Sequence, residues 1–271
     1  MKVCGSLVLT HVAARAYSVR LTHSARSSAR TLLTESTETI RPQGLSEIKL
    51  ALITPNCNSY YATDSTTLAF PDPYWAFLWP GGWGLTRYVL DNPSVVKGRP
   101  VLDFASGSGV CAIAAKLGGA SRVAANDIDP WATHAAELNA DMNGVAIECI
   151  EDNMIGTDCS TEWPVVLVGD ALYDEEMGDI VVPWLLHLAT GGARVLIGDP
   201  GRCEFEWDGI VVCHGYVCEE EGGVLCHYDT VMYDGFHCVV RSDMCGVDNY
   251  TARDVDDAVD GYARAATRCW V

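Results

Sequence analysis

Short apolar runs alternate with helix-like stretches through residues 99–201, and this alternation limits the possible folds more than any other feature of the sequence. The runs "RPVLDFA", "RVAANDID", "AIECIEDN", "PVVLVGDALY" and "ARVLIGDPGR" have the length and composition of buried strands. Between them, "GVCAIAAKLGG" and "PWATHAAELNADMNG" carry apolar residues at helical spacing, and the second starts with proline and ends with glycine. Strands joined through helices form a mostly parallel sheet with helices on both faces, so we expect an α/β, Rossmann-like fold.

An acidic residue stands at or near the end of each expected strand. These residues are Asp103, Asp127, Asp152, Asp170 and Asp199. In open α/β sheets, ligands bind in the crevice beyond the carboxyl ends of the strands. We therefore expect the functional site along this edge of the sheet.

The turn after the first of these strands reads "DFASGSG" and lacks the Gly-x-Gly-x-x-Gly order of dinucleotide-binding loops. Gly107 and Gly109 allow a ligand to approach the backbone closely. Asp103 adds a carboxylate that would repel a pyrophosphate and attract a cation, and Asp127 could bind both hydroxyls of a ribose. A ribose joined to a positively charged centre is the pattern of S-adenosylmethionine, which is the cofactor that we expect.

Five ordered segments, "DPYWAFLWPGG", "LDFASGSG", "NDIDP", "GDALYDE" and "IGDPGR", resemble the class I, seven-stranded, S-adenosylmethionine-dependent methyltransferases. Within that group the chain is similar to protein lysine methyltransferases whose fourth strand ends in Asp-x-x-Tyr, here Asp170 to Tyr173. The resemblance covers residues 47–205 and implies that the sheet ends in two antiparallel strands from the region that follows. The chain departs from the family at Ala105, where glycine is frequent.

The resemblance also implies roles for individual residues. Asp170 would orient the target lysine and help its proton to leave, and Tyr173 would close over the amine. A helix cap is the alternative role for Asp170, and packing is the alternative for Tyr173. The cofactor would be held by Trp79, Asp103, Ala105, Gly107, Gly109, Asp127, Ile128, Asp152 and Asn153.

Three of these cofactor assignments have structural alternatives. Asp103 and Asp127 could also serve as turn or cap residues. Trp79 would lie over the cofactor as part of a lid, but its spacing of four from Trp75 and Trp83 also fits core packing.

The net charge of −18 argues against a nucleic acid partner, because a phosphate backbone requires a basic surface. The sequence contains no run of about 18 apolar residues, so we expect no membrane partner. A Lys-bearing protein substrate suits the acidic body, and we expect a monomer. Methyl transfer to another protein or to a small amine, and an inactive S-adenosylmethionine-binding protein, remain the alternatives.

The composition divides the chain into four zones. Residues 1–40 resemble a mitochondrial transit peptide or a disordered leader, because the first 34 residues contain five basic residues and no acidic one. Residues 41–98 form a cap segment, residues 99–240 the methyltransferase core, and residues 241–271 an atypical acidic tail. The leader predicts the mitochondrial matrix; without a functional leader the protein would be cytoplasmic.

Seven of the twelve cysteines follow residue 201. Their spacing lacks the compact Cys-x-x-Cys pair of structural zinc sites, so we expect no metal. Free thiols in a reducing compartment are the expected state of these cysteines.

Overall fold

The computed structural model describes residues 23–61 and 70–199, together with strands between residues 212 and 243. Within these residues, no helix is both long enough and apolar enough to cross a membrane. Residues 244–271 of the predicted acidic tail 241–271 lie outside the described residues, while residues 241–243 belong to a strand.

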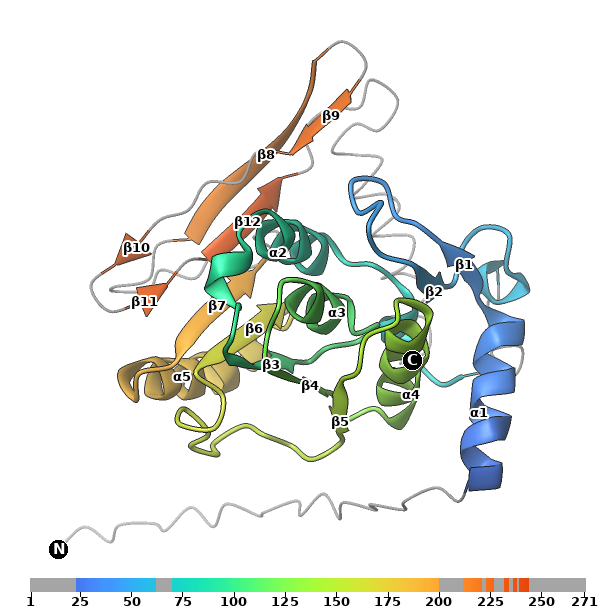
Figure 1. Cartoon of the computed structure of the whole chain (residues 1–271), viewed down its shortest axis with the longest axis horizontal. Coiled ribbons are helices and arrows are strands. Elements are labelled where there is room, and N and C mark those ends of the chain that lie inside the picture. The colour runs from blue at the N-terminus through green and yellow to red at the C-terminus, as the bar shows by residue number, and fades with distance from the viewer. Residues whose placement is uncertain are drawn as a thin grey trace, which may run out of the picture.

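The centre of the molecule is a sheet in the order β5-β4-β3-β6-β7-β12-β8-β9 (Figure 1). The first five of these strands are parallel to one another. Their bounds are β3 Pro100–Phe104, β4 Arg122–Asn126, β5 Glu148–Ile150, β6 Val165–Gly169 and β7 Arg194–Gly198. The expected α/β fold with a mostly parallel sheet is confirmed.

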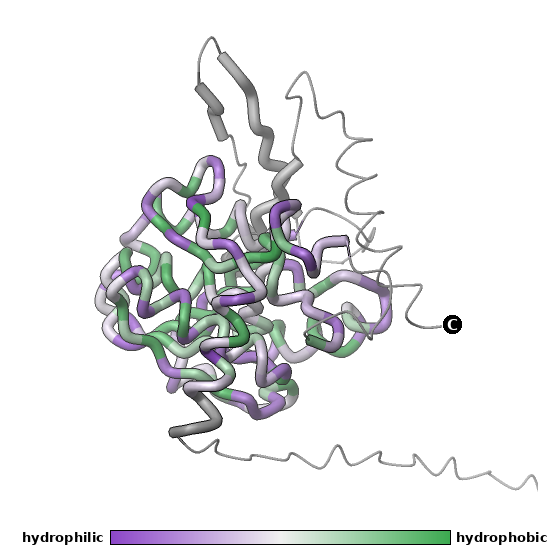
Figure 2. Tube along the Cα trace, turned by 90° about the vertical axis from the view of Figure 1, so that its right-hand side faces the viewer, coloured by the Kyte–Doolittle hydropathy of each residue, from purple (hydrophilic) through white to green (hydrophobic). Residues whose placement is uncertain are grey.

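Helices cover both faces of the sheet because successive residues of a buried strand point to opposite sides. On one face, Val101 and Leu167 pack with residues of α2 Pro80–Asp91, α3 Val110–Leu117 and α4 Pro130–Met142. On the other face, Leu102 and Val166 pack with α5 Glu175–Thr190. Figure 2 shows green apolar stretches through the middle of this body and purple ones at the turns around it. Burial on both faces explains why the strands carry continuous apolar runs rather than alternating ones.

The far edge of the sheet differs from the expectation of seven strands ending in an antiparallel pair. β12 Val239–Asp243 pairs in parallel with both β7 and β8 Val212–Glu220, and β8 pairs antiparallel with β9 Gly223–Cys226. The described sheet therefore has eight strands, because the region after residue 205 contributes three of them. A separate small pair joins β10 Met232–Tyr233 and β11 Phe236–His237.

The N-terminal zone is ordered further upstream than the sequence analysis expected. Helix α1 His23–Ser36 packs against α4, and strand β1 Glu38–Ile40 pairs with β2 Leu50–Leu52. Leu33 is only 1% exposed, and Arg30 forms an ion pair of 2.6 Å with Asp141. A disordered leader that extends to residue 40 is therefore wrong for residues 23–40. The prediction of a transit peptide stays a prediction for residues 1–22, which lie outside the described residues.

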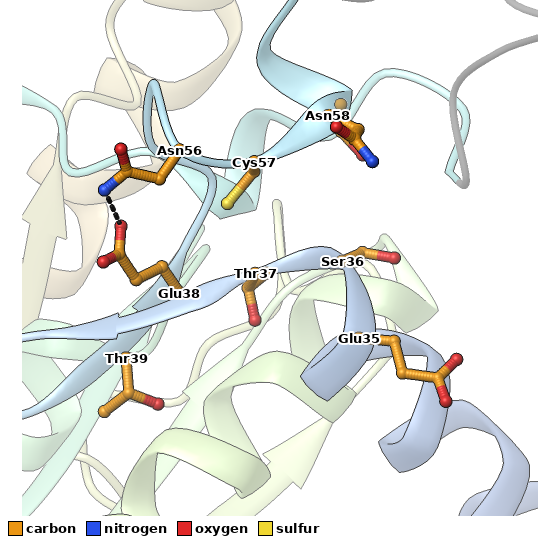
Figure 3. A pocket seen from close by; sticks show the side chains of 9 residues that line it. Glu35, Ser36, Thr37, Glu38, Thr39, Asn56, Cys57 and Asn58 are labelled. Atoms are coloured by element: carbon orange, nitrogen blue, oxygen red, sulfur yellow. Dashed lines mark hydrogen bonds between the residues drawn. The ribbon is translucent and has the colours of Figure 1, made fainter.

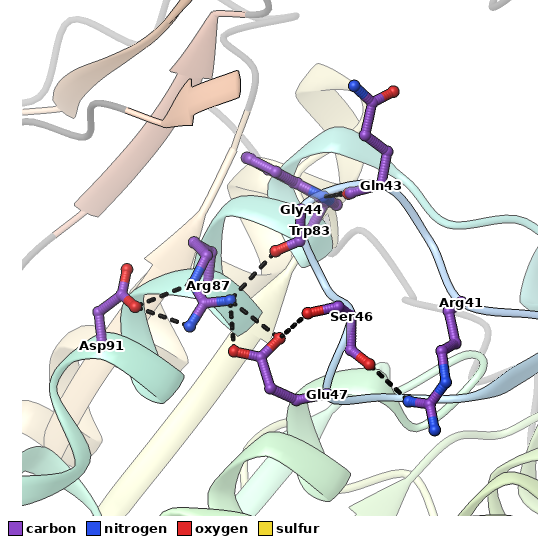
Figure 4. A network of polar contacts seen from close by, with 8 residues as sticks. All are labelled: Arg41, Gln43, Gly44, Ser46, Glu47, Trp83, Arg87 and Asp91. Atoms are coloured by element: carbon purple, nitrogen blue, oxygen red, sulfur yellow. Dashed lines mark hydrogen bonds and ion pairs between the residues drawn. The ribbon is translucent and has the colours of Figure 1, made fainter. Parts of the chain in front are cut away.

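A polar network fastens the loop before β2 to helix α2 (Figure 4). Nη1 of Arg87 donates to the carbonyl oxygen of Gly44 at 3.1 Å and lies 3.0 Å from Oε1 of Glu47, while Nη2 lies 2.7 Å from Oδ1 of Asp91. Nε1 of Trp83 donates to the carbonyl oxygen of Gln43 at 2.9 Å. The network holds the outer side of α2, whose first turn reaches the ends of β6 and β7.

Candidate active site

The carboxyl ends of β3, β4 and β6 bring together the acidic residues that the sequence singled out. Asp103 lies in β3, Asp127 follows β4, and Asp170 follows β6. Electrostatic interactions couple Asp103 with Asp127, and couple Asp127 with Tyr173. Cys111, in α3, interacts with both Asp103 and Asp170. These residues therefore surround one region at the edge of the sheet.

Asp127 holds the glycine loop in place. Its Oδ2 accepts a hydrogen bond of 2.9 Å from the Gly107 amide, and its Oδ1 accepts one of 3.0 Å from the Asp129 amide. Burial raises the pKa of the Asp127 carboxyl, although these amides oppose the shift. Each carboxylate oxygen has two lone pairs, so both oxygens retain acceptor capacity for ribose hydroxyls.

The loop between β3 and α3 uses left-handed backbone at three positions. Gly107 has φ +49° and Gly109 has φ +76°, and a side chain on Gly109 would meet Cβ of Ala136 at 2.7 Å. Ala105 has φ +52°, a conformation that costs an L-residue about 1–2 kcal/mol. Glycine, which the family resemblance implies at this position, adopts that conformation freely.

Asp103 accepts a hydrogen bond from the backbone of α3, which agrees with its alternative role as a turn or cap residue. It is 1% exposed, and its Oδ2 accepts a hydrogen bond of 2.8 Å from the Ala112 amide of α3. Burial raises the pKa of the Asp103 carboxyl well above its usual range, and the charge of Asp127 adds to the shift. The bond joins β3 to α3, and a direct role in attracting the sulfonium stays a prediction.

Asp170 combines a strained backbone with a buried carboxylate. Its φ is +56°, its amide donates to the Gly198 carbonyl oxygen at 2.9 Å, and it is 9% exposed. Its Oδ2 accepts a hydrogen bond of 2.6 Å from the amide of Gly82, in the first turn of α2. Asp170 therefore binds a helix N-terminus, as its alternative role anticipated, but the donor residue Gly82 precedes it by 88 residues, in a helix that comes before Asp170 rather than after it.

Three glycines at this contact were missed by the sequence analysis. A Cβ on Gly81 would lie 2.3 Å from the Gly198 carbonyl oxygen, one on Gly198 would lie 2.1 Å from the Gly81 carbonyl oxygen, and one on Gly169 would lie 2.9 Å from Cα of Gly82. The sequence signals for this contact were the two glycines of "PGG" and the glycines at the ends of β6 and β7. These glycines are needed because the backbones of segments that are distant in the sequence approach each other closely, and the sequence alone does not show that approach.

Two aromatic residues lie at the rim of the region. Tyr173 is 54% exposed, and partial burial raises the pKa of its hydroxyl, to which the charges of Asp174 and Asp127 contribute. Trp79 is the residue before α2, and its Nε1 donates to the carbonyl oxygen of Tyr74 at 2.9 Å. Tyr74 interacts with Tyr173, so the segment before α2 and the segment after β6 approach each other. This geometry suits a lid, and the role of Trp79 in binding stays a prediction.

The residues assigned to the adenine side lie on the surface next to β4 and β5. Ile128 is 71% exposed, and Asp152 and Asn153 are exposed as well. Nδ2 of Asn126 donates to the carbonyl oxygens of Ile150 and Asp152, at 2.9 Å each, and so holds the segment after β5 beside the end of β4. An exposed apolar side chain beside Asp127 fits the face of an adenine ring next to its ribose.

The residues of the loop fit S-adenosylmethionine. Besides the acceptors on Asp127, the Ser106 hydroxyl is buried and has no hydrogen-bond partner among the described residues. A buried hydroxyl normally finds a partner, so one that lacks it next to a cofactor loop is suited to a ligand contact. The described residues contain no group of side chains that could hold a metal ion.

A separate polar cavity of about 610 Å³ lies between the end of α1, β1 and residues 56–59 (Figure 3). Glu38 accepts a hydrogen bond of 3.0 Å from Nδ2 of Asn56 and another from the Thr54 hydroxyl. Cys57 also lines it and is a free thiol, as are Cys111, Cys149 and Cys159. The seven cysteines after residue 201 have no described side chains, so their predicted state stays a prediction.

Comparison with known proteins shows the family. Residues 84–182 match the model of the ribosomal protein L11 methyltransferases (PrmA). The electron transfer flavoprotein β-subunit lysine methyltransferase of Danio rerio is 48% identical over 175 residues, which are 64% of this chain and 67% of that protein. The protein of the same name from Xenopus laevis is 42% identical over 178 residues, or 65% of this chain and 72% of that protein.

The family match includes the glycine loop and the strand-end residues Asp103, Asp127, Asp152 and Asp170, which belong to the region described above. The chain is thus an S-adenosylmethionine-dependent protein-lysine methyltransferase and belongs to the electron transfer flavoprotein β-subunit lysine methyltransferase family.

Proposed function

We propose that the enzyme methylates lysine side chains of the electron transfer flavoprotein β-subunit and that Asp170 and Tyr173 handle the target lysine. The names of the relatives support the substrate. The observation that carries the site is the position of Asp170, whose carboxylate lies at the end of β6, one strand away from the glycine loop that follows β3.

A lysine must lose its proton before its nitrogen can act as a nucleophile. With a reference pKa near 10.4, deprotonation at pH 7 costs about 1.36 kcal/mol for each of roughly 3.4 units, or about 4.6 kcal/mol. Alignment of the reacting groups supplies much of the remaining acceleration. S-adenosylmethionine supplies an electrophilic methyl group when bound.

The chain's own residues would work on the amine. The Asp170 carboxylate would accept a hydrogen bond from the incoming ammonium, orient it and help its proton to leave. The Tyr173 hydroxyl, exposed at the rim, would accept a second hydrogen bond and close over the amine. Asp127 would hold the ribose hydroxyls, with Ile128 against the adenine.

Mutation of the two carboxylates separates catalysis from cofactor binding. We expect Asp170→Ala to lower kcat by about 100-fold or more, while the affinity for S-adenosylhomocysteine stays within about threefold. Asp127→Ala should weaken that affinity by about 10-fold or more, because two charge-assisted hydrogen bonds are lost. Transfer of labelled methyl groups to the recombinant β-subunit and calorimetry with S-adenosylhomocysteine measure the two quantities. Full activity of Asp170→Ala would remove this residue from the mechanism.

The identity of the acceptor needs a separate test, because the matched family model is that of ribosomal protein L11 methyltransferases. Labelled S-adenosylmethionine, added with the enzyme to a mitochondrial extract, should label the β-subunit of electron transfer flavoprotein. Label on a ribosomal protein alone would contradict the proposed substrate. Binding of the cofactor with no transfer to any lysine would favour the inactive alternative.

The proposed substrate is consistent with a location in the mitochondrial matrix, which the basic, acid-free start of the chain also favours. A fusion of residues 1–22 to a reporter should enter isolated mitochondria in a membrane-potential-dependent manner. A reporter that stays outside would contradict import through this segment.

A further inference from the structure

We propose that the Pro80-Gly81-Gly82 turn at the start of α2 is the positioning device of the Asp170 carboxylate. The inference rests on the proposed role of Asp170 in handling the target lysine. It assigns the turn to the lysine side of the reaction, whereas the residue before the turn, Trp79, was expected to lie over the cofactor.

The contact is direct and involves backbone rather than side chains. The Gly82 amide donates to Oδ2 of Asp170 at 2.6 Å, which is short for a hydrogen bond between an amide and a carboxylate. Gly82 lies in the first turn of α2, where amides have no acceptor within the helix. The amides of a helix N-terminus attract negative charge, so this turn orients the carboxylate.

The turn is held against the strand ends by close backbone packing. Side chains on Gly81 and Gly198 would overlap with the carbonyl oxygens of each other's residues, at 2.3 Å and 2.1 Å. A side chain on Gly169 would lie 2.9 Å from Cα of Gly82. These three positions therefore require glycine, and without them α2 could not bring the Gly82 amide to Asp170.

The backbone of Asp170 indicates the same coupling from the other side. Asp170 has φ +56°, in the left-handed region that L-residues avoid, and its amide is fixed by the Gly198 carbonyl oxygen. Strain of this kind persists where the surroundings determine the conformation, and it gathers at functional sites. Here the strain directs the carboxylate away from its own strand and toward the turn of α2.

The test removes the single amide hydrogen. In Gly82→Pro a ring carbon takes the place of the hydrogen, so Asp170 has to turn away, whereas the conservative Gly82→Ala variant keeps the amide and has Cβ 3.7 Å from Oδ2. We expect Gly82→Pro to lower kcat by about 100-fold, the loss also expected for Asp170→Ala, with the affinity for S-adenosylhomocysteine within about threefold. Gly82→Ala should recover at least about a third of the wild-type kcat.

The Gly192→Ala variant controls for the effect of lost stability alone. Gly192 follows the end of α5, far along the chain from the turn, and has φ +98° with open space around it, so alanine there strains the backbone without a steric clash. We expect this variant to melt at a lower temperature with an unaltered kcat. If Gly82→Pro does not fold, residue 82 is replaced by its α-hydroxy acid, which exchanges the N–H for an ester oxygen without added bulk. A kcat within about threefold of the wild type, in either variant lacking the amide, would overturn the inference.

A second measurement does not depend on catalysis and so separates this inference from the proposed function. The amide proton of Gly82 should resonate downfield in the wild type and move upfield in Asp170→Ala, because a hydrogen bond to a carboxylate deshields the proton. An unchanged resonance would contradict the contact itself. A wild-type enzyme that shows the shift but methylates no lysine would sink the proposed function instead.

Discussion

At the scale of single residues, Ala105 stands where the family resemblance implies glycine, and the structure gives the physical consequence. With φ +52°, Ala105 occupies a conformation that glycine adopts freely. We expect Ala105→Gly to raise the free energy of unfolding by about 1 kcal/mol, since relief of strain exceeds the added chain entropy. Urea denaturation measures the change. Ala114→Gly, in the middle of α3, is the control and should lower stability by about 1 kcal/mol; a loss of the same size at residue 105 would contradict the argument.

Asp129 provides a prediction about pH. Burial raises its pKa to about 6, and the charges of Asp127, Asp72 and Glu151 raise it further. The hydrogen bond from the Trp131 amide acts in the opposite direction and lowers the pKa. Because the folded state binds this proton more tightly than the unfolded chain does, the contribution of Asp129 to stability is fully present below about pH 4 and is lost as pH rises through about 6.

Asp129→Asn should remove this dependence while it keeps the acceptor that caps α4. We expect the variant to be more stable than the wild type by about 1 kcal/mol at pH 7.5, after screening by solvent, and equally stable at pH 4. Thermal unfolding across this pH range is the measurement. Asp158→Asn is the control of opposite sign, because hydrogen bonds from Ser160 lower the pKa of Asp158. A constant difference between Asp129→Asn and the wild type at all pH values would refute the assignment.

At the scale of elements, helix α1 belongs to the folded body. Leu33 is 1% exposed in a cluster with Trp75 and Ala135, so Leu33→Ala should lower the free energy of unfolding by about 3 kcal/mol. Deletion of residues 1–36 should lower the melting temperature, because it removes Leu33 from this cluster. Thr34→Ala, at an exposed position of the same helix, should change stability by less than about 0.5 kcal/mol. If Leu33→Ala and Thr34→Ala are equally stable, α1 does not contribute to the stability of the folded body, and the prediction is wrong.

The helices and strands also differ in how far the sequence predicted them. The five parallel strands and their helices were predictable because each strand is buried on both faces and therefore reads as an unbroken apolar run. Helix α1 was missed because its serines and arginines, with a single acidic residue at Glu35, resemble a leader. Among residues 27–36, whose burial is described, Ala29 and Leu33 are the buried apolar residues, and they lie four residues apart. The basic, serine-rich composition of this segment therefore favoured a leader more strongly than two apolar residues favoured a packed helix.

The site was predictable to the extent that it depends on strand ends. Asp127 and Asp170 follow their strands, so chain order alone brings them to one edge. The contact of Gly82 with Asp170 was not predictable, because it joins residues 88 apart through backbone atoms that carry no side-chain signal. The burial of Asp103 was not predictable either, since its partner is a backbone amide of α3.

At the scale of the whole molecule, the net charge of −18 gives the last prediction. A strongly acidic enzyme should attract a basic, Lys-bearing surface over a distance that salt shortens, so substrate binding should weaken as ionic strength rises. Between about 50 mM and about 500 mM NaCl we expect KM for the protein substrate to rise by about 10-fold, with a smaller change in kcat. A lysine peptide of zero net charge is the control, and its KM should respond little. If the protein substrate and the peptide respond alike, the acidic body has no part in docking, and recognition is confined to the residues around Asp170.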